Sequence, residues 1–175
     1  MGYCGEVDKV DLNSFALASG QGASINGEVR FEPVRLGGQE YVAKPDPIPV
    51  RIDISRTLSG FALRLRCEVE LVGSCMRCLE PATVKIAVDA REVDQPGTGD
   101  AELESPYVNL DELDVTAWTR DAIVLGAPNQ ILCREDCAGL CPTCGESLND
   151  APEGAHDHGP KTDPRWAALK EIRFD

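Results

Sequence analysis

Strict alternation of apolar and polar positions dominates the middle of the chain. It begins at residues 50–55 and is clearest at residues 61–71, where the apolar positions are Phe61, Leu63, Leu65, Cys67, Val69 and Leu71. A period of two predicts strands with one face on a core and the other in water. Ser59-Gly60 predicts a hairpin turn between the two runs. A third alternating run at residues 84–90 extends the prediction to an antiparallel meander of at least three strands.

The first 49 residues show a weaker pattern. Residues 1–43 contain short apolar pieces separated by glycines, which predict short strands or an N-terminal arm. Residues 44–49 then carry three alternating prolines, Pro45, Pro47 and Pro49. Because proline donates no backbone hydrogen bond, this piece is predicted to be an extended, unpaired connector into the next strand.

Helical spacing appears only in the last third of the chain. The apolar stripe of the first predicted helix is Val115, Trp118, Ala122 and Leu125. Asn109 is its predicted N-cap, with Glu112 placed as in a capping box, and Gly126 and Pro128 end it. A last helix is predicted to start at Asp163, with Trp166, Leu169 and Ile172 as its stripe.

Four cysteines, Cys133, Cys137, Cys141 and Cys144, lie between these two predicted helices within twelve residues. The last pair belongs to a C-P-x-C-G turn, in which both sulfurs point inward and the glycine lets backbone amides approach the thiolates. Disulfides are the alternative. The N-terminus does not resemble a signal peptide, however, and cytosolic thiols stay reduced. A zinc site is therefore the favoured interpretation.

A further C-x-x-C pair, Cys75 and Cys78, lies between two predicted strands. Such a pair can be half of a zinc site, a redox pair or two buried small residues. Redox pairs of the thioredoxin type usually lie at a helix N-terminus, so the flanking strands disfavour that function. Beside the second cysteine cluster, the pair becomes a candidate metal half-site.

The cysteine-rich segment also resembles a known family. Residues 132–149 read L-C-x-x-D-C-x-G-L-C-x-x-C-G-x-x-L-N, which is similar to the C-terminal signature of the bacterial YceD family. Three further pieces agree in order and spacing: V-G-x-C-x-R-C-L-E-P at residues 72–81, D-E-L-D at 111–114 and D-P-R-W-x-x-L at 163–169. The resemblance covers the chain from about residue 51 to the end, and the family is linked to accumulation of large-subunit ribosomal RNA.

The resemblance adds two candidate ligands, His156 and His158. Many YceD-like sequences have C-x-C where this chain has H-D-H, and imidazole can replace thiolate at zinc. The candidate ligands are then Cys75, Cys78, Cys133, Cys137, Cys141, Cys144, His156 and His158. They allow one site made of the four C-terminal cysteines. They equally allow two sites, with the histidines joining the C-P-x-C-G pair and Cys75 and Cys78 joining Cys133 and Cys137. Either arrangement leaves no position open, which predicts structural Zn²⁺.

These observations predict an α+β fold: an antiparallel β-sheet or partly closed barrel, one connecting helix, and a C-terminal zinc-knuckle segment with a terminal helix. The predicted organisation is an arm with short strands at residues 1–49, a meander with an acidic loop at 50–108, and the helix and cysteine-rich segment at 109–175.

The net charge limits the partners. The chain has 30 acidic and 17 basic residues, a formal charge of −13. This balance disfavours direct contact with RNA phosphates unless the basic residues are concentrated. A basic ribosomal or assembly protein of the large subunit is the predicted partner. Residues 89–114, with nine carboxylates against Arg91, are a candidate contact, although solvated surface is the commoner explanation. Their middle, residues 95–100, is predicted to be a mobile loop.

The resemblance implies a non-enzymatic factor that supports 23S ribosomal RNA accumulation in ribosome biogenesis. The lack of a membrane span and of a complete lipidation signal predicts a cytoplasmic protein. No P-loop or dinucleotide fingerprint is present, so neither an enzyme nor a small-molecule substrate is expected. No apolar run approaches the roughly 18 residues of a membrane span. The alternatives are a zinc-binding interaction module outside ribosome biogenesis and, with less support, a thiol redox protein.

Overall fold

The computed structural model describes residues 5–97, 99–152 and 154–159. Its main element is a six-stranded antiparallel sheet in the order β2-β5-β6-β4-β3, with β7 on the other side of β6. The strands are β2 (Gly22–Val29), β3 (Val34–Leu36), β4 (Gln39–Lys44), β5 (Ile48–Arg56), β6 (Phe61–Ser74) and β7 (Pro81–Asp94). The predicted antiparallel sheet is confirmed. It is open, and the described strands do not close into a barrel.

β6 is the centre of this sheet. Its first half pairs with β5 and its second half with β4, while β7 follows it over all fourteen residues. The apolar positions that predicted the strand are all buried: Phe61, Leu63, Leu65, Cys67, Val69 and Leu71. The alternation is therefore confirmed, and it fixes which face of the sheet carries the core.

A small second sheet joins distant parts of the chain in the order β1-β9-β8. Its strands are β1 (Lys9–Asp11), β8 (Val108–Asn109) and β9 (Glu112–Asp114). Two short 3-10 turns, η1 (Leu12–Phe15) and η2 (Ala101–Leu103), flank it. The acidic segment at residues 89–114 is thus partly strand, and the described residues of 95–100 form no helix or strand.

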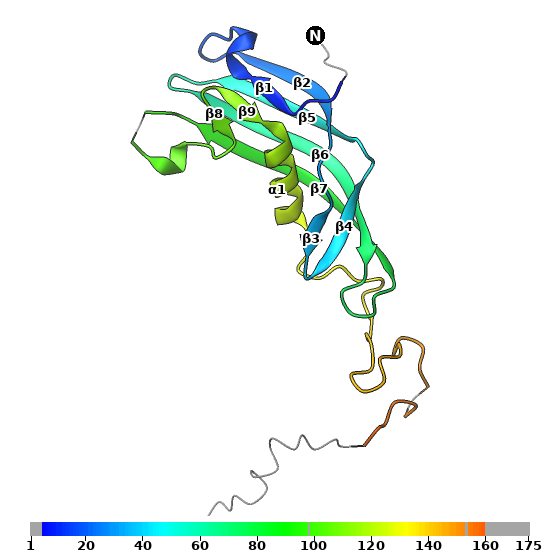
Figure 1. Ribbon diagram of the computed structural model, residues 1–175. Coiled ribbons are helices and arrows are strands. Elements are labelled where there is room, and N and C mark those ends of the chain that lie inside the picture. Colours follow the sequence, from blue (N-terminus) through cyan, green and yellow to red (C-terminus); the bar gives the residue numbers. More distant parts are fainter. Residues whose placement is uncertain (1–4, 98, 153, 160–175) are drawn as a thin grey trace, which may run out of the picture.

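α1 (Val115–Gly126) follows β9 directly and lies across one face of the main sheet (Figure 1). Its N-cap is Asp114, whose side chain accepts a hydrogen bond from the Ala117 amide. The predicted cap at Asn109 is wrong, because β1 pairs with residues 112–114 and keeps them extended. Trp118 is buried as predicted, whereas Leu125 is 83% exposed and does not belong to the buried stripe.

The connector prediction is also wrong in part. Ile48 and Pro49 belong to β5 and pair with Val29 and Glu28 of β2. A proline is compatible with a strand position where no amide donor is required. Only residues 45–47 lie between β4 and β5.

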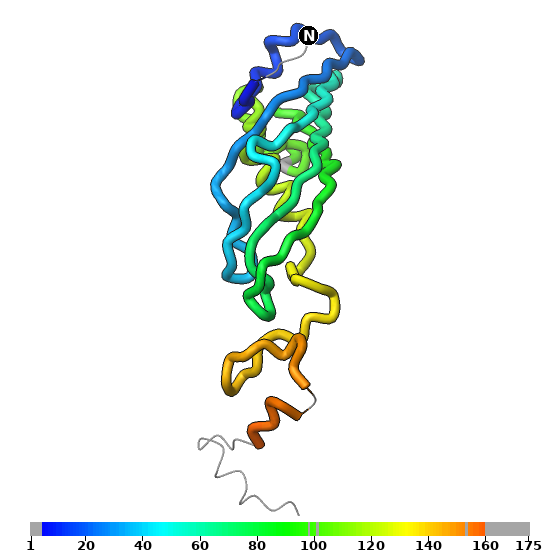
Figure 2. Tube along the Cα trace, turned by 90° about the vertical axis from the view of Figure 1, so that its right-hand side faces the viewer, coloured from blue at the N-terminus to red at the C-terminus, as the bar shows by residue number. Residues whose placement is uncertain are grey.

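The cysteine-rich segment continues beyond the end of the β6–β7 hairpin, as Figures 1 and 2 both show. The predicted terminal helix from Asp163 lies outside the described residues. The division at residues 49 and 108 stays a prediction, although strands from both of the first two parts share the main sheet. Within the described chain, no helix has the length and apolar character needed to cross a membrane.

Candidate metal centres

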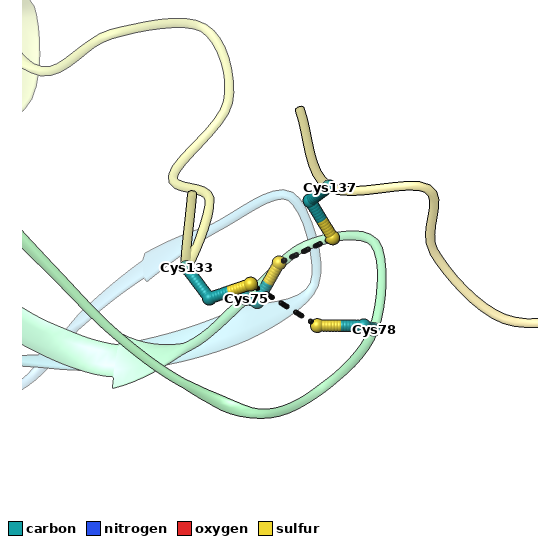
Figure 3. Close-up of side chains that lie close together, drawn as sticks. All are labelled: Cys75, Cys78, Cys133 and Cys137. Atoms are coloured by element: carbon teal, nitrogen blue, oxygen red, sulfur yellow. Dashed lines mark hydrogen bonds between the residues drawn. The ribbon is translucent and has the colours of Figure 1, made fainter. Parts of the chain in front are cut away.

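The first candidate centre contains only cysteines and is called here the four-cysteine group: Cys75, Cys78, Cys133 and Cys137. Cys75 and Cys78 lie in the turn between β6 and β7, and the other two lie in the loop after α1 (Figure 3). All four sulfurs lie within 4.8 Å of one another. Three of the four residues are buried, and Cys133 is partly buried.

The sulfur separations distinguish a metal site from disulfides. The Cys75 and Cys137 sulfurs are 3.7 Å apart, and those of Cys78 and Cys133 are 3.5 Å apart. A disulfide requires about 2.05 Å. Tetrahedral zinc, with Zn–S bonds of about 2.3 Å, places its sulfurs about 3.8 Å apart. The four-cysteine group therefore has the spacing of a tetrahedral metal site.

Contacts outside the sulfurs hold the two halves of this group together. The Met76 amide donates to the Ile131 carbonyl at 2.9 Å, and Ile131 is buried. The Arg77 guanidinium donates to the Cys137 carbonyl and to Gln130 Oε1, both at 3.0 Å. The hairpin turn thus contacts the loop after α1 through hydrogen bonds in addition to the cysteine sulfurs.

The turn that carries Cys75 and Cys78 has a defined backbone pattern. The Cys75 amide donates to the Glu80 carbonyl at 2.7 Å, and the Leu79 amide donates back to the Cys75 carbonyl at 3.0 Å. Leu79 has a left-handed φ of 65°. The pair Ser74 and Pro81 closes the turn in the β6–β7 ladder.

The same pattern recurs 66 residues later, in the turn that carries Cys141 and Cys144. The Cys141 amide donates to the Glu146 carbonyl and the Gly145 amide donates to the Cys141 carbonyl, both at 2.8 Å. Gly145 has a φ of 77°, and a bridge between Leu140 and Ser147 closes the turn. Both C-x-x-C pairs therefore lie in turns with the same hydrogen bonds, one with leucine and one with glycine at the left-handed position.

The second candidate centre, the cysteine–histidine group, consists of Cys141, Cys144, His156 and His158. Their ligand atoms also lie within 4.8 Å of one another. The Cys144 sulfur is 3.3 Å from His156 Nδ1, close to the roughly 3.6 Å that tetrahedral zinc sets between a sulfur and a nitrogen ligand. Cys141 is buried, whereas Cys144 and His158 are exposed.

Backbone amides favour the thiolate of the first cysteine in each turn. Burial raises the pKa of Cys75, but hydrogen bonds from the Cys78 and Arg77 amides outweigh burial and lower it. The Cys144 and Thr143 amides lower the pKa of Cys141. Cys133 behaves oppositely, since its hydrogen bond with Cys78, together with burial, raises its pKa. A bound cation would offset the repulsion among the thiolates and let all of them ionise.

A short braced link connects the two groups. Asn149 accepts a hydrogen bond from the Ala138 amide through its side chain at 2.9 Å. Its carbonyl accepts one from the Arg134 guanidinium at 2.6 Å, and the Leu148 amide donates to the Gly139 carbonyl at 2.9 Å. The cysteine–histidine group is therefore tied to the loop that supplies Cys133 and Cys137.

All eight sequence-predicted ligands fall into these two groups, in the two-site arrangement. The four C-terminal cysteines do not gather into one set in the described chain. No sequence pattern indicates the docking contacts made by Met76 and Arg77. Their partners, Ile131 and Gln130, lie more than fifty residues away along the chain, and no local pattern identifies such pairs.

The described chain thus combines an antiparallel sheet with a Cys4 group and a Cys2His2 group, each of which could hold a metal ion. The family model described as "Large ribosomal RNA subunit accumulation protein YceD" matches residues 63–173, and the chain belongs to this family.

Two mycobacterial relatives illustrate the similarity. The uncharacterized protein Rv2926c of Mycobacterium tuberculosis strain H37Rv is 36% identical over 106 residues, which are 58% of this chain and 50% of that protein. The uncharacterized protein ML1660 of Mycobacterium leprae is 42% identical over 60 residues, which are 34% of this chain and 26% of that protein. The chain thus spans half the length or less of these relatives. No solved structure matches it.

Proposed function

We propose that this protein is a non-enzymatic factor that supports accumulation of 23S ribosomal RNA, and that its two ligand groups each hold a structural Zn²⁺. Membership of the YceD family carries the first part, because the family model covers most of the chain. The second part rests on sulfur separations of 3.5 and 3.7 Å in the four-cysteine group.

The proposed role of the metal is structural for a coordination reason. Each group supplies four protein ligands, so a tetrahedral ion in it has no position left for water or substrate. Catalytic zinc sites keep such a position open. With one Zn²⁺ each, the four-cysteine group carries a net charge of −2, while the cysteine–histidine group, with neutral imidazoles, is neutral.

A strain that lacks the gene tests the RNA part of this proposal. The ratio of 23S to 16S ribosomal RNA is expected to fall in this strain and to recover with the wild-type gene. It is expected to stay low with Cys137→Ala, which removes a ligand, and to recover with Cys67→Ala, which removes a buried cysteine outside both groups. An unchanged ratio in the deletion strain, under conditions in which the protein is normally made, would contradict the proposed role.

For the partner, we propose a basic ribosomal or assembly protein of the large subunit, met in the cytoplasm. The charge of −13 supports this class. The acidic residues near η2 would steer the encounter, so association should slow when Asp100, Glu102 and Glu104 are replaced by lysine, and binding should weaken as salt rises. Capture of a large-subunit protein by the wild type is the expected result. Tight binding to protein-free ribosomal RNA at physiological salt, without any such capture, would contradict it.

A further inference from the structure

The outer edge of β7 has no partner strand in the described chain. β7 runs for 14 residues and pairs with β6 alone. The opposite edge of the sheet differs, because the Val7 amide and the Gly5 carbonyl bond to Glu28 of β2 and partly cover it. An uncovered edge strand offers a row of backbone donors and acceptors to another strand. Among the described strands, β7 is the longest such edge.

The sequence of β7 is complementary to itself when two copies run antiparallel with Ala87 opposite Ala87. On the outer face, Lys85, which is 3.4 Å from Glu70 of β6, then lies opposite Asp89, which is 2.6 Å from Arg64 of β6. On the core face, Ile86 lies opposite Val88 and Val84 opposite Ala90. Cross-strand pairs of opposite charge and of apolar side chains stabilise a sheet, and each occurs twice in this symmetric pairing.

Neighbouring registers lack this match. Moving the symmetry point to Val88 places Lys85 opposite Arg91, a repulsive pair that occurs twice. Moving it to Ile86 places Lys85 opposite Ala87 and leaves both Lys85 and Asp89 without an oppositely charged neighbour on the facing strand. Of these three registers, only the one centred on Ala87 places Lys85 opposite Asp89.

The helix above this edge supplies a second observation. A methyl group at Gly126 would lie 3.0 Å from the Ile86 side chain, so the end of α1 sits over the middle of β7. The preceding residue, Leu125, is 83% exposed, which is unusual for a leucine in a helix packed on a sheet. In the Ala87 register the two Ile86 residues flank the symmetry axis. The two Leu125 side chains would therefore be brought close to that axis and could bury each other.

We propose that two copies of this chain associate through β7, antiparallel and with Ala87 at the two-fold axis. The two main sheets then form one continuous sheet, with α1 of each copy on the same face. The occupant is a second copy because the strand's charges and apolar residues match their own reversed order. This proposal is independent of the role in ribosomal RNA accumulation.

Register-specific crosslinking with oxidised glutathione in the zinc-loaded full chain tests the proposal. Ala87→Cys is expected to give a disulfide-linked dimer in high yield, because directly opposed residues have Cα atoms about 4.5–5.5 Å apart, within disulfide range. Thr83→Cys alone is the control and should give no such dimer, since its two copies would be about 26 Å apart along the strand. A mixture of Thr83→Cys and Arg91→Cys chains should link again, since these positions are opposite each other.

Light scattering of the uncrosslinked chain supplies the second readout. The wild type is expected to be a dimer at micromolar concentration, and Leu125→Glu should raise the dissociation constant at least tenfold. Leu58→Glu, which changes a leucine that is 94% exposed in the β5–β6 turn, should leave it unchanged. A monomer at all concentrations up to 100 μM, or crosslinking of Thr83→Cys alone as efficient as that of Ala87→Cys, would overturn the proposal.

Discussion

The four-cysteine group and the cysteine–histidine group share one turn but differ in what they connect. Cys75 and Cys137 are 62 positions apart, so the first group joins the tip of the main sheet to the loop after α1. Cys144 and His156 are only 12 positions apart, so the second group closes a local loop. Closing the longer loop costs only about 1.5 kcal/mol more in chain entropy than closing the shorter one. The two groups differ more in burial, because three cysteines of the first group are buried while Cys144 and His158 are exposed.

One turn geometry therefore serves two purposes in this protein. In the four-cysteine group, a structural ion would lock a contact between the sheet and the rest of the chain. In the cysteine–histidine group, an ion would order only the segment that contains it.

The largest effect is expected from Cys137→Ala. It should abolish the first site, lower the melting temperature of the main sheet and detach the cysteine-rich segment, because a structural zinc contributes on the order of 10 kcal/mol in small modules. Thermal unfolding together with zinc content checks it, and Cys67→Ala is the control that should keep both zinc ions. A normal zinc content in Cys137→Ala would contradict the assignment.

A smaller effect is expected from Cys144→Ala. It should remove one zinc and the hydrogen-exchange protection of residues 141–158, while the melting of the sheet shifts by less than about 0.5 kcal/mol, as for surface changes. Hydrogen exchange followed by mass spectrometry separates the two regions. The contrast between the groups fails if the sheet loses as much stability here as in Cys137→Ala.

The left-handed position of the shared turn gives the third prediction. Gly145→Val should weaken zinc binding in the second group by about 1–2 kcal/mol, roughly five- to thirty-fold, since a branched side chain is strained at this φ. Leu79→Gly removes the corresponding strain from the first turn and should leave its zinc in place. Chelator competition measures both, with Gly5→Val as a control at a site with open space around it. Equal affinities in Gly145→Val and wild type would show that the turn geometry is unimportant.

Arg77→Met is expected to have the smallest effect on zinc binding. It removes the bonds to the Cys137 carbonyl and Gln130 but no ligand, so stability should fall by about 1–2 kcal/mol with both zinc ions retained. Arg35→Met, at an exposed ion pair with Glu40, is the matched control and should change little. Loss of zinc in Arg77→Met would show that this arginine is also needed to hold the metal ligands in place.

The sequence predicts the strands well where one face is buried. The period of two in β6 survives because a shift of one residue would expose every core side chain, and the structure buries all six predicted positions. The N-cap of α1 could not be predicted in the same way. Residues 112–114 resemble the first turn of a helix, but β1, some hundred residues earlier, holds them in a strand.

The candidate ligands are also readable from the sequence, because cysteine pairs and the H-x-H motif are local. Their partition is not. Cys133 and Cys137 are closer in sequence to Cys141 than to Cys75, yet they meet Cys75 and Cys78 because the β6–β7 hairpin docks on Ile131. That docking depends on long-range packing, and spacing rules carry no information about it.

Zinc stoichiometry decides whether the chain holds two zinc ions, one or none. Native mass spectrometry of reductively purified protein should find two zinc ions per chain in the wild type, one in Cys78→Ala and one in Cys144→Ala. Cobalt substitution of these two variants should then give different thiolate charge-transfer bands, weaker for Cys78→Ala, which retains the site with two thiolates. If the wild type held one zinc and Cys78→Ala kept it, the four C-terminal cysteines would form a single site. A wild type without zinc would show that neither group is a zinc site.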